Sequence, residues 1–256
     1  TKIESILFDT IEEIRDYAVY NNKSLIDVNA TSSLNTFEIS FNDNMKSIGS
    51  YAFAGVDKIR SVVVNHTIGK QVSRGAQEGY LGDYVFASNR ALTNIVLNNY
   101  ELGDHMFDGC LSLASVTVPA QIQYVGTHVF ANNPSLTSFE MENGIIGEYM
   151  FYHDLGLKTV RVPANVKEIG YGAFGACANI TSMSLPFIGM HQFDETSSKF
   201  EGLFGYIFGH KTESDAAMEE IIQTYEGNEI QSVHEDITAK QNVSVLDTVY
   251  TSKDLD

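Results

Sequence analysis

The sequence is poor in positive charge, in cysteine and in long apolar runs. Of its 256 residues, 16 are Lys or Arg and 33 are Asp or Glu, so the formal net charge is -17. A field of this sign repels phosphate backbones and anionic lipid headgroups, so we do not expect nucleic acid as a partner. No run of about 18 apolar residues is present, and the opening TKIESILFD lacks the basic and apolar regions of a signal peptide. We therefore expect no membrane insertion by this segment.

Catalytic motifs and metal sites are also missing. The sequence contains no GxSxG, HExxH or GxxxxGK[ST] pattern. Its two cysteines, Cys110 and Cys177, are too few for a disulfide scaffold or a four-ligand zinc site. Gly170, Gly172 and Gly175 do spell GxGxxG, but the helix that a dinucleotide-binding loop requires does not follow, because CANITSMSL reads as a strand. The sequence predicts no catalytic residue, no metal site and no cofactor.

The glycine spacing belongs to a longer pattern, a repeat in seven copies. The segment IGYGAFGACANITSMSL recurs in degenerate form, with an aliphatic anchor, glycine at the next position (+1) in six copies, and phenylalanine at +5 in six copies. From Leu81 onward the units alternate between 21 and 23 residues, and the two longer gaps before it contain insertions at 29–47 and 65–80. The anchors are Ile14, Ile48, Leu81, Leu102, Val125, Ile146 and Ile169. The residues at +5 are Val19, Phe53, Phe86, Phe107, Phe130, Phe151 and Phe174.

Each unit predicts one strand. Residues +11 to +16 alternate, with +14 and +16 apolar and +13 and +15 mostly polar, as in LASVTV and LKTVRV. This period of two is typical of a strand with one buried face. One strand per unit, joined by turns and short helices, returns parallel to itself and builds a solenoid in which anchors and phenylalanines pack on neighbouring units. The glycine at +1 is expected to mark either an unusual backbone conformation or a close approach of two backbones.

These residues also carry a family resemblance. The pattern IGxxAFxxCxxLxxVxVP, fullest in IGYGAFGACANITSMSLP and LGDHMFDGCLSLASVTVP, resembles the BspA-like class of leucine-rich repeats of bacterial and protist surface proteins, over residues 14–209. The resemblance implies an α/β repeat fold, a right-handed leucine-rich-repeat solenoid with a parallel β-sheet on its concave face and an irregular, short-helical convex side. It also implies cell-surface exposure and adhesion or protein binding, without shared catalytic residues.

The family's cysteine at +8 remains only as Cys110 and Cys177. Three rungs separate the two thiols, about 15 Å at about 5 Å per strand, which exceeds the reach of a disulfide. We therefore expect both cysteines to be small buried side chains in the core.

The domain organisation predicted from the repeat has three parts. Residues 1–13 form a partial or capping repeat, residues 14–189 form the solenoid, and residues 190–256 form degenerate repeats and a carboxy-terminal cap. In the last part, Leu203–Phe208 restores the spacing from anchor to phenylalanine, and the segment 216–225 predicts a short amphipathic helix. EIQSV and NVSVLDTVY are weaker strand candidates.

The polar positions +13 and +15 predict a binding face. If they point away from the core, they form two columns across the sheet, where short hydroxyls and amides can hydrogen-bond a partner. A second interpretation stays open, in which small polar residues are simply compatible with crowded strands. Glu140 and Arg161, on adjacent rungs, are expected to form an exposed ion pair. The predicted site residues are Ser61, Asn94, Ser115, Thr117, Ser138, Glu140, Thr159, Arg161 and Ser182.

A further column, at +3, is aromatic. Such a column could grip a sugar or a protein, or it could pack half-buried with its polar tips in water. His105 and His128 lie one rung apart with Asp104 nearby, and two histidines are too few for a metal site. The column contains Tyr17, Tyr51, Tyr84, His105, His128 and Tyr149.

The solenoid pattern and the family resemblance together predict a non-enzymatic leucine-rich-repeat module that binds through its concave face; the resemblance implies that it is extracellular, at the cell surface, and mediates adhesion or protein–protein interaction. Its partner would be a host or microbial surface protein or glycan, and the chain itself is expected to be a monomer. Two alternatives stay open. The array could be a rigid structural spacer within a larger surface protein, or a carbohydrate-active hydrolase with a site in the insertions around 65–80 and 190–202.

Overall fold

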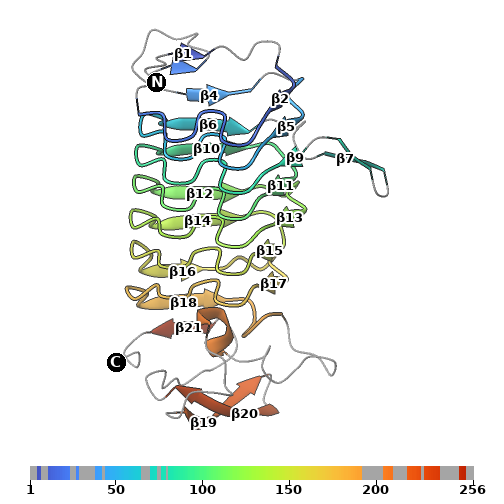
Figure 1. Cartoon of the computed structure of the whole chain (residues 1–256). Coiled ribbons are helices and arrows are strands. Elements are labelled where there is room, and N and C mark those ends of the chain that lie inside the picture. The colour runs from blue at the N-terminus through green and yellow to red at the C-terminus, as the bar shows by residue number, and fades with distance from the viewer. Residues whose placement is uncertain are drawn as a thin grey trace.

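The repeat region is a stack of parallel rungs along one axis (Figure 1). The computed structural model describes residues 5–6, 11–23, 27–28, 38–41, 44–64, 70–73, 76–78, 80–191, 204–209, 218–225, 228–236 and 248–251. Wherever strands of successive units pair in the repeat region, they pair in parallel. This arrangement confirms the leucine-rich-repeat solenoid expected from the sequence.

Each regular rung contains two short strands, so the expectation of one strand per unit is wrong. The first is the alternating segment, and the second consists of the anchor and the residue before it. Two residues are too few to show a period of two, so the sequence pattern does not reveal the second strand. The first column of strands comprises β4 (Glu38–Ser40), β6 (Ser61–Val64), β10 (Asn94–Leu97), β12 (Ser115–Val118), β14 (Ser138–Met141), β16 (Thr159–Arg161) and β18 (Ser182–Leu185) (Figure 1). The second comprises β2 (Glu13–Ile14), β5 (Ser47–Ile48), β9 (Tyr80–Leu81), β11 (Glu101–Leu102), β13 (Tyr124–Val125), β15 (Ile145–Ile146) and β17 (Glu168–Ile169) (Figure 1).

Strand pairing follows the alternating unit length. β12 pairs with β14 and β16 with β18, and in the second column β11 pairs with β13 and β15 with β17. All four pairs join units that are 23 residues apart. Across the 21-residue units, β10 and β12 fall in separate hydrogen-bonded sheets, as do β14 and β16. Both strand columns are therefore interrupted at every second rung of this region.

The third side of each rung, between the anchor and the alternating strand, carries a backbone ladder that is not interrupted. The N–H groups at +3, +5 and +7 donate to the carbonyls at +2, +4 and +6 of the next unit, from Tyr17 to Gly175. We call this the turn ladder. Across a 23-residue junction the bonds are His105 to Thr127 (2.8 Å), Phe107 to Val129 (2.8 Å) and Gly109 to Ala131 (2.9 Å). Across a 21-residue junction they are Tyr84 to Asp104 (2.8 Å), Phe86 to Met106 (3.0 Å) and Ser88 to Asp108 (2.7 Å).

The turn ladder requires left-handed backbone at two positions of every rung. Residues at +3 and +7 have positive φ, for example His128 (55°) and Asn132 (58°). Glycine meets this need only at Gly55, Gly109 and Gly172, so bulky side chains adopt a conformation that they rarely take. Their hydrogen bonds to the next rung hold them there.

The glycine at +1 serves close approach rather than positive φ, which settles the two options left by the sequence. A Cβ at Gly82 would lie 2.4 Å from the backbone nitrogen of Ser50, and one at Gly170 would lie 2.4 Å from that of Glu148. No side chain fits at such distances, because the neighbouring atom belongs to the backbone of the preceding rung. The +1 glycine therefore allows the second strand column to pack closely.

Phenylalanines at +5 form the centre of the core, as the sequence predicts. All six are fully buried. The rings of successive rungs stack nearly parallel, with centroids 5.5 Å apart between Phe86 and Phe107 and 6.1 Å apart between Phe130 and Phe151. The anchors Ile48, Leu102 and others pack around this column in a single apolar cluster.

A second core column, at +8, is partly polar. It contains Val56, Asn89, Cys110, Asn133, Asp154 and Cys177. Asn89 donates through Nδ2 to the carbonyls of Phe53 (3.0 Å) and Phe86 (2.8 Å). The Sγ of Cys177 bonds the carbonyl of Phe151 at 2.9 Å. The two cysteines are free and buried, as expected. Burial raises the pKa of both thiols to about 12, so they act as hydrogen-bonding core residues and not as reactive thiols.

Asp154 is the acidic member of this column. Its Oδ1 accepts the N–H of Asn133 at 2.7 Å, and its Oδ2 is buried without a partner. Burial raises the pKa of Asp154 to about 9, although the bond from Asn133 acts in the opposite direction. The folded protein therefore keeps this carboxyl protonated at neutral pH.

Both insertions contribute strands. β4 lies inside the 29–47 insertion and pairs in parallel with β6, and its Ile39 is buried in the core. This insertion thus adds a strand to the sheet. The 65–80 insertion holds an antiparallel hairpin that projects from the stack (Figure 1). The remaining strands of this half are β1 (Ser5–Ile6), β3 (Asp27–Val28), β7 (Lys70–Ser73) and β8 (Ala76–Glu78).

The helix predicted for residues 216–225 is wrong. β19 (Met218–Tyr225) forms an antiparallel hairpin with β20 (Asn228–Asp236). The apolar residues of MEEIIQTY have helical spacing, but pairing with β20 overrides this local preference. EIQSV is confirmed as part of β20, and the end of NVSVLDTVY as part of β21 (Thr248–Thr251), which pairs antiparallel with β18.

The last buried position also differs from the expected one. Leu203 lies outside the described residues, and the 3₁₀ helix η1 (Phe204–Phe208) follows it. Ile207 is fully buried, whereas Phe208 is only partly buried. The N–H of Phe174 donates to the carbonyl of Ile207 at 2.9 Å. Ile207 therefore continues the core column, one residue earlier than the spacing predicts.

Removal of one ring from the phenylalanine column should strongly destabilise the chain. We expect Phe107→Ala to lower the free energy of unfolding by roughly 3 to 5 kcal/mol, because the ring leaves a cavity between two others. Leu111→Ala, at a side chain that is 41% exposed, serves as the control and should have little effect. Urea unfolding checks both, and a loss below about 1 kcal/mol for Phe107→Ala would contradict this role.

Asp154→Asn should remove a pH dependence of stability. The folded state holds the Asp154 proton up to about pH 9, whereas the unfolded chain releases it near 3.8. Stability is therefore present at low pH and is lost as pH rises from about 4 toward 9. We expect the variant to exceed the wild type by more than about 1 kcal/mol at about pH 8 and the gap to close near pH 4.

Asparagine already occupies this column at Asn89 and Asn133, so the variant should keep the fold. Urea unfolding at several pH values makes the measurement, with the exposed Glu142→Gln as the control substitution. Parallel stability curves for Asp154→Asn and the wild type would show that the buried carboxyl does not govern this dependence.

Candidate interaction surfaces

The rungs present three long surfaces. The sheet face is the outward side of β6, β10, β12, β14, β16 and β18, and it contains the predicted binding columns. The turn face carries the aromatic column at +3. The anchor face is the outward side of β2, β5, β9, β11, β13, β15 and β17.

The sheet face brings the predicted site residues together in columns. In the paired strands, Ser115 lies opposite Ser138, Thr117 opposite Glu140, Thr159 opposite Ser182, and Asn94 opposite Ser61. Most of these side chains are exposed and Ser182 is partly buried. Ser61 is only 8% exposed, and its hydroxyl accepts a hydrogen bond from Asn94 at 3.0 Å.

The expected ion pair between Glu140 and Arg161 does not form. Both residues lie in the described part of the repeat region, and no contact within ion-pairing distance joins them there. They belong to β14 and β16, which sit on either side of a 21-residue junction and fall in separate sheets. Adjacent rungs therefore do not guarantee adjacent side chains in this column.

Hydroxyl groups on the sheet strands differ in their hydrogen bonding from the hydroxyl groups just before those strands. Thr93, Thr137 and Thr181, at +12, donate to carbonyls of the preceding rung at 3.1 to 3.2 Å. Ser112 and Ser135 do the same at +10. Among the described contacts, the hydroxyls of the +13 and +15 columns on the central strands make no hydrogen bond within the chain. These are Ser115, Thr117, Ser138 and Thr159. Their hydroxyls remain available to a partner.

On the turn face, the aromatic column is continuously stacked. Ring centroids of successive rungs lie 4.3 to 4.9 Å apart with interplanar angles of 4 to 14°. Five of the six rings are partly buried, which confirms half-buried packing. The stack ends at Gly172, where a Cβ would lie 2.5 Å from the ring of Tyr149.

The two histidines of this column are paired differently. The Nδ1 of His105 lies 2.8 Å from Oδ2 of Asp108. The Nδ1 of His128 is buried and has no hydrogen-bond partner. Burial, and to a smaller extent the neighbouring His105, lowers the pKa of His128. No group of three His, Cys, Asp or Glu within the described residues is placed to hold a metal ion.

Acidic residues of the anchor face hold the rungs together at +2. Four of the +2 side chains, three of them acidic, accept the backbone N–H at +2 of the next unit. The bonds are Ser50 N to Asp16 Oδ1 (2.8 Å), Asp83 N to Ser50 Oγ (3.1 Å), Asp104 N to Asp83 Oδ1 (3.0 Å) and Thr127 N to Asp104 Oδ1 (2.8 Å). This part of the negative charge therefore has a structural role.

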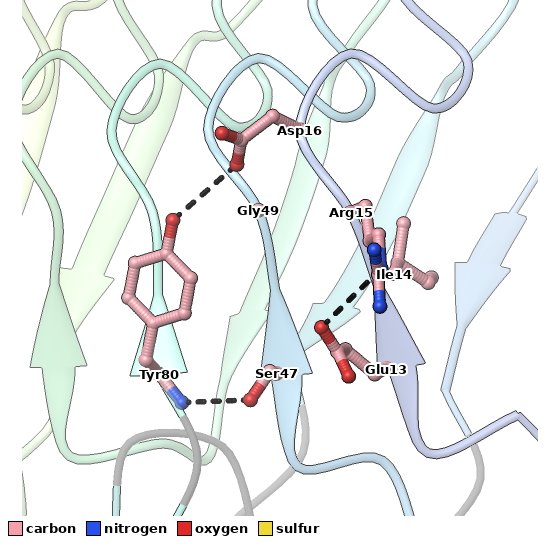
Figure 2. Close-up of a pocket in the computed structure, with 7 residues that line it drawn as sticks. All are labelled: Glu13, Ile14, Arg15, Asp16, Ser47, Gly49 and Tyr80. Atoms are coloured by element: carbon pink, nitrogen blue, oxygen red, sulfur yellow. Dashed lines mark hydrogen bonds and ion pairs between the residues drawn. The ribbon is translucent and has the colours of Figure 1, made fainter.

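A cavity of about 420 Å³ opens on the anchor face over β2, β5 and β9 (Figure 2). It lies where Ser47, a small residue, stands between the larger Glu13 and Tyr80 at the outward position of three successive strands. The sequence prediction misses this cavity. The second strand column has to be known before the single small residue in it can be noticed.

Comparison with known proteins shows which family the sequence resembles. The model of the BspA type leucine rich repeat region matches residues 31–74 and 79–199 in six copies. None of the curated proteins compared is a significant match. Within the described residues, no helix has the length and apolar character needed to cross a bilayer.

Several solved structures are similar in fold. A leucine-rich repeat protein of T. pallidum is 18% identical, with a TM-score of 0.48, over 70% of this chain and 79% of that chain. A leucine rich cell surface protein of Faecalibacterium prausnitzii is 15% identical, with a TM-score of 0.37, over 81% and 82%. The pneumococcal vaccine antigen PcpA is 15% identical, with a TM-score of 0.47, over 71% and 50%. Because the family model covers more than half of the sequence, the chain belongs to the BspA-type leucine-rich repeat family.

Proposed function

We propose that this chain is a non-enzymatic, cell-surface module that mediates adhesion or protein–protein interaction through its sheet face. The observation that carries the proposal is the difference between hydroxyl groups on and beside this face. Those at +10 and +12 bond the preceding rung, whereas those of Ser115, Ser138 and Thr159 are exposed and unused. A regular array of free donors and acceptors suits a macromolecular partner.

The partner is a host or microbial surface protein or glycan. The formal charge of -17 opposes nucleic acid and anionic membranes. Placement at the cell surface rests on the family resemblance. The chain is proposed to act as a monomer.

The absence of catalysis is part of this proposal. The strongly perturbed groups of the described residues, Cys110, Asp154 and Cys177, lie inside the core column and not in a cavity. The alternative hydrolase site around 65–80 and 190–202 falls largely outside the described residues.

A rigid spacer is the second candidate function. The continuity of the turn ladder across both junction types favours it, because three backbone bonds per rung resist bending at every step. A spacer would carry other domains of a longer surface protein and would bind no partner of its own.

Added charge on the sheet face should distinguish a binding module from a rigid spacer. We expect the wild type to bind members of an array of host surface proteins and glycans. The combined variant Ser115→Lys, Ser138→Lys and Thr159→Lys should weaken that binding by about tenfold or more, because long charged side chains cover the free hydroxyls. Circular dichroism and thermal unfolding should show an unchanged fold.

The matched control places the same charges at the exposed positions Ala120, Gln123 and Ala164, beyond the sheet strands. This control variant should bind as the wild type does. Equal binding by the sheet-face variant would exclude the proposed face, and the absence of any partner for the wild type would favour the spacer.

A further inference from the structure

The cavity on the anchor face is a gap in a regular column. The outward residue of the second strand is large at Glu13, Tyr80 and Tyr124, and Ser47 is the smallest member of the column. Because strands are about 4.8 Å apart, the walls on β2 and β9 stand about 10 Å from each other. Ser47 on β5 and Gly49, which follows that strand, form the floor between them (Figure 2). We call this cavity the slot.

One wall of the slot is a held aromatic ring. The Tyr80 side chain is 45% exposed, and its hydroxyl lies 3.4 Å from Oδ1 of Asp16. Asp16 is itself held by the N–H of Ser50 at 2.8 Å, and the N–H of Tyr80 donates to Ser47 Oγ at 3.2 Å. Tyr80 is therefore held at its side-chain hydroxyl and at its backbone N–H, which reduces the entropy that a ligand would lose in ordering the residue.

The opposite wall mixes charges. Glu13 and Arg15 on the first rung lie 3.7 Å apart, and both side chains are exposed (Figure 2). The slot thus offers a guanidinium donor, carboxylate acceptors on Glu13 and Asp16, and hydroxyls that both donate and accept.

This set of groups selects the ligand chemistry. A cationic side chain would be repelled by Arg15, and a phosphate would be repelled by Glu13 and Asp16. The hydroxyls of a sugar both donate and accept, so they suit a mixed lining. The apolar face of a pyranose ring can pack on the exposed Tyr80 ring. A volume of about 420 Å³ is within the range of small-molecule sites.

We propose that the slot binds a neutral saccharide residue, packed against Tyr80 and hydrogen-bonded by Glu13, Arg15 and Asp16. The site lies on the anchor face, on different strands from the proposed binding columns of the sheet face. It does not depend on the sheet face having a partner. The two surfaces together would let one module engage both the glycan and the protein of a glycosylated surface.

The test uses neutral methyl glycosides of glucose, galactose, mannose and N-acetylglucosamine as probes, with saturation-transfer NMR on the full chain. We expect at least one of them to bind with a Kd of about 1 to 10 mM, as suits a ligand of this size. Tyr80→Ala removes the wall and Ser47→Tyr fills the floor. Each should weaken binding by about tenfold or more.

Tyr124→Ala is the matched control, because Tyr124 occupies the same outward position two rungs further on and is 57% exposed. It should bind the probe as the wild type does. Thermal unfolding of each variant shows that the fold is kept, and Ser47→Tyr keeps the result interpretable should Tyr80→Ala unfold.

Four results would overturn the proposal. The first three are no binding of any probe, a loss of sugar binding in Tyr124→Ala equal to that in Tyr80→Ala, and retained sugar binding in Ser47→Tyr. The fourth is binding of a tetra-arginine peptide at Tyr80 in place of the sugar. The triple lysine variant of the sheet face should leave sugar binding unchanged. If it abolishes sugar binding, the sugar lies on the sheet face, and the slot is excluded while the proposed function stands.

Discussion

Three backbone hydrogen bonds join each rung to the next on the turn side, and the rest of the fold depends on them. Both strand columns of the repeat region break at the 21-residue junctions, whereas the turn ladder crosses junctions of both lengths. The left-handed residues at +3 and +7 present two of the three N–H groups, and the residue at +5 presents the third. The same geometry stacks the aromatic column on one side and the buried phenylalanines on the other.

Because the rungs are held in register, single residues at equivalent positions determine the features of each surface. The sheet face places Ser115 beside Ser138 because their rungs are held in register, and their hydroxyls stay free because the +10 and +12 positions make the bonds between rungs. The slot has the same origin: one small residue, Ser47, in a column of larger ones leaves a gap of one rung. The fold therefore supplies a regular scaffold, and the recognition chemistry lies in the residues that vary on it.

Much of this architecture could be predicted from the sequence, because apolar residues recur at fixed offsets in seven units. The phenylalanine column and the polar columns of the sheet face follow from that grid. The second strand column does not, since two residues show no alternation. Positive φ at Tyr and His is imposed by contacts between rungs and is not favoured by those residues. The strand β19 has helical spacing, and its partner β20 decides its structure. The slot lies in the second strand column, so it cannot be predicted from the sequence until that column is known.

Native-state hydrogen exchange tests the role of the turn ladder most directly. The amides of Phe86 and Phe130 cross 21-residue junctions, and that of Phe107 crosses a 23-residue junction. If the ladder is the continuous connection, all three amides exchange only on global unfolding, and their protection yields the same free energy. Exchange of Phe86 and Phe130 that is more than about tenfold faster than that of Phe107 would contradict the account, because the stack would then open at its short junctions.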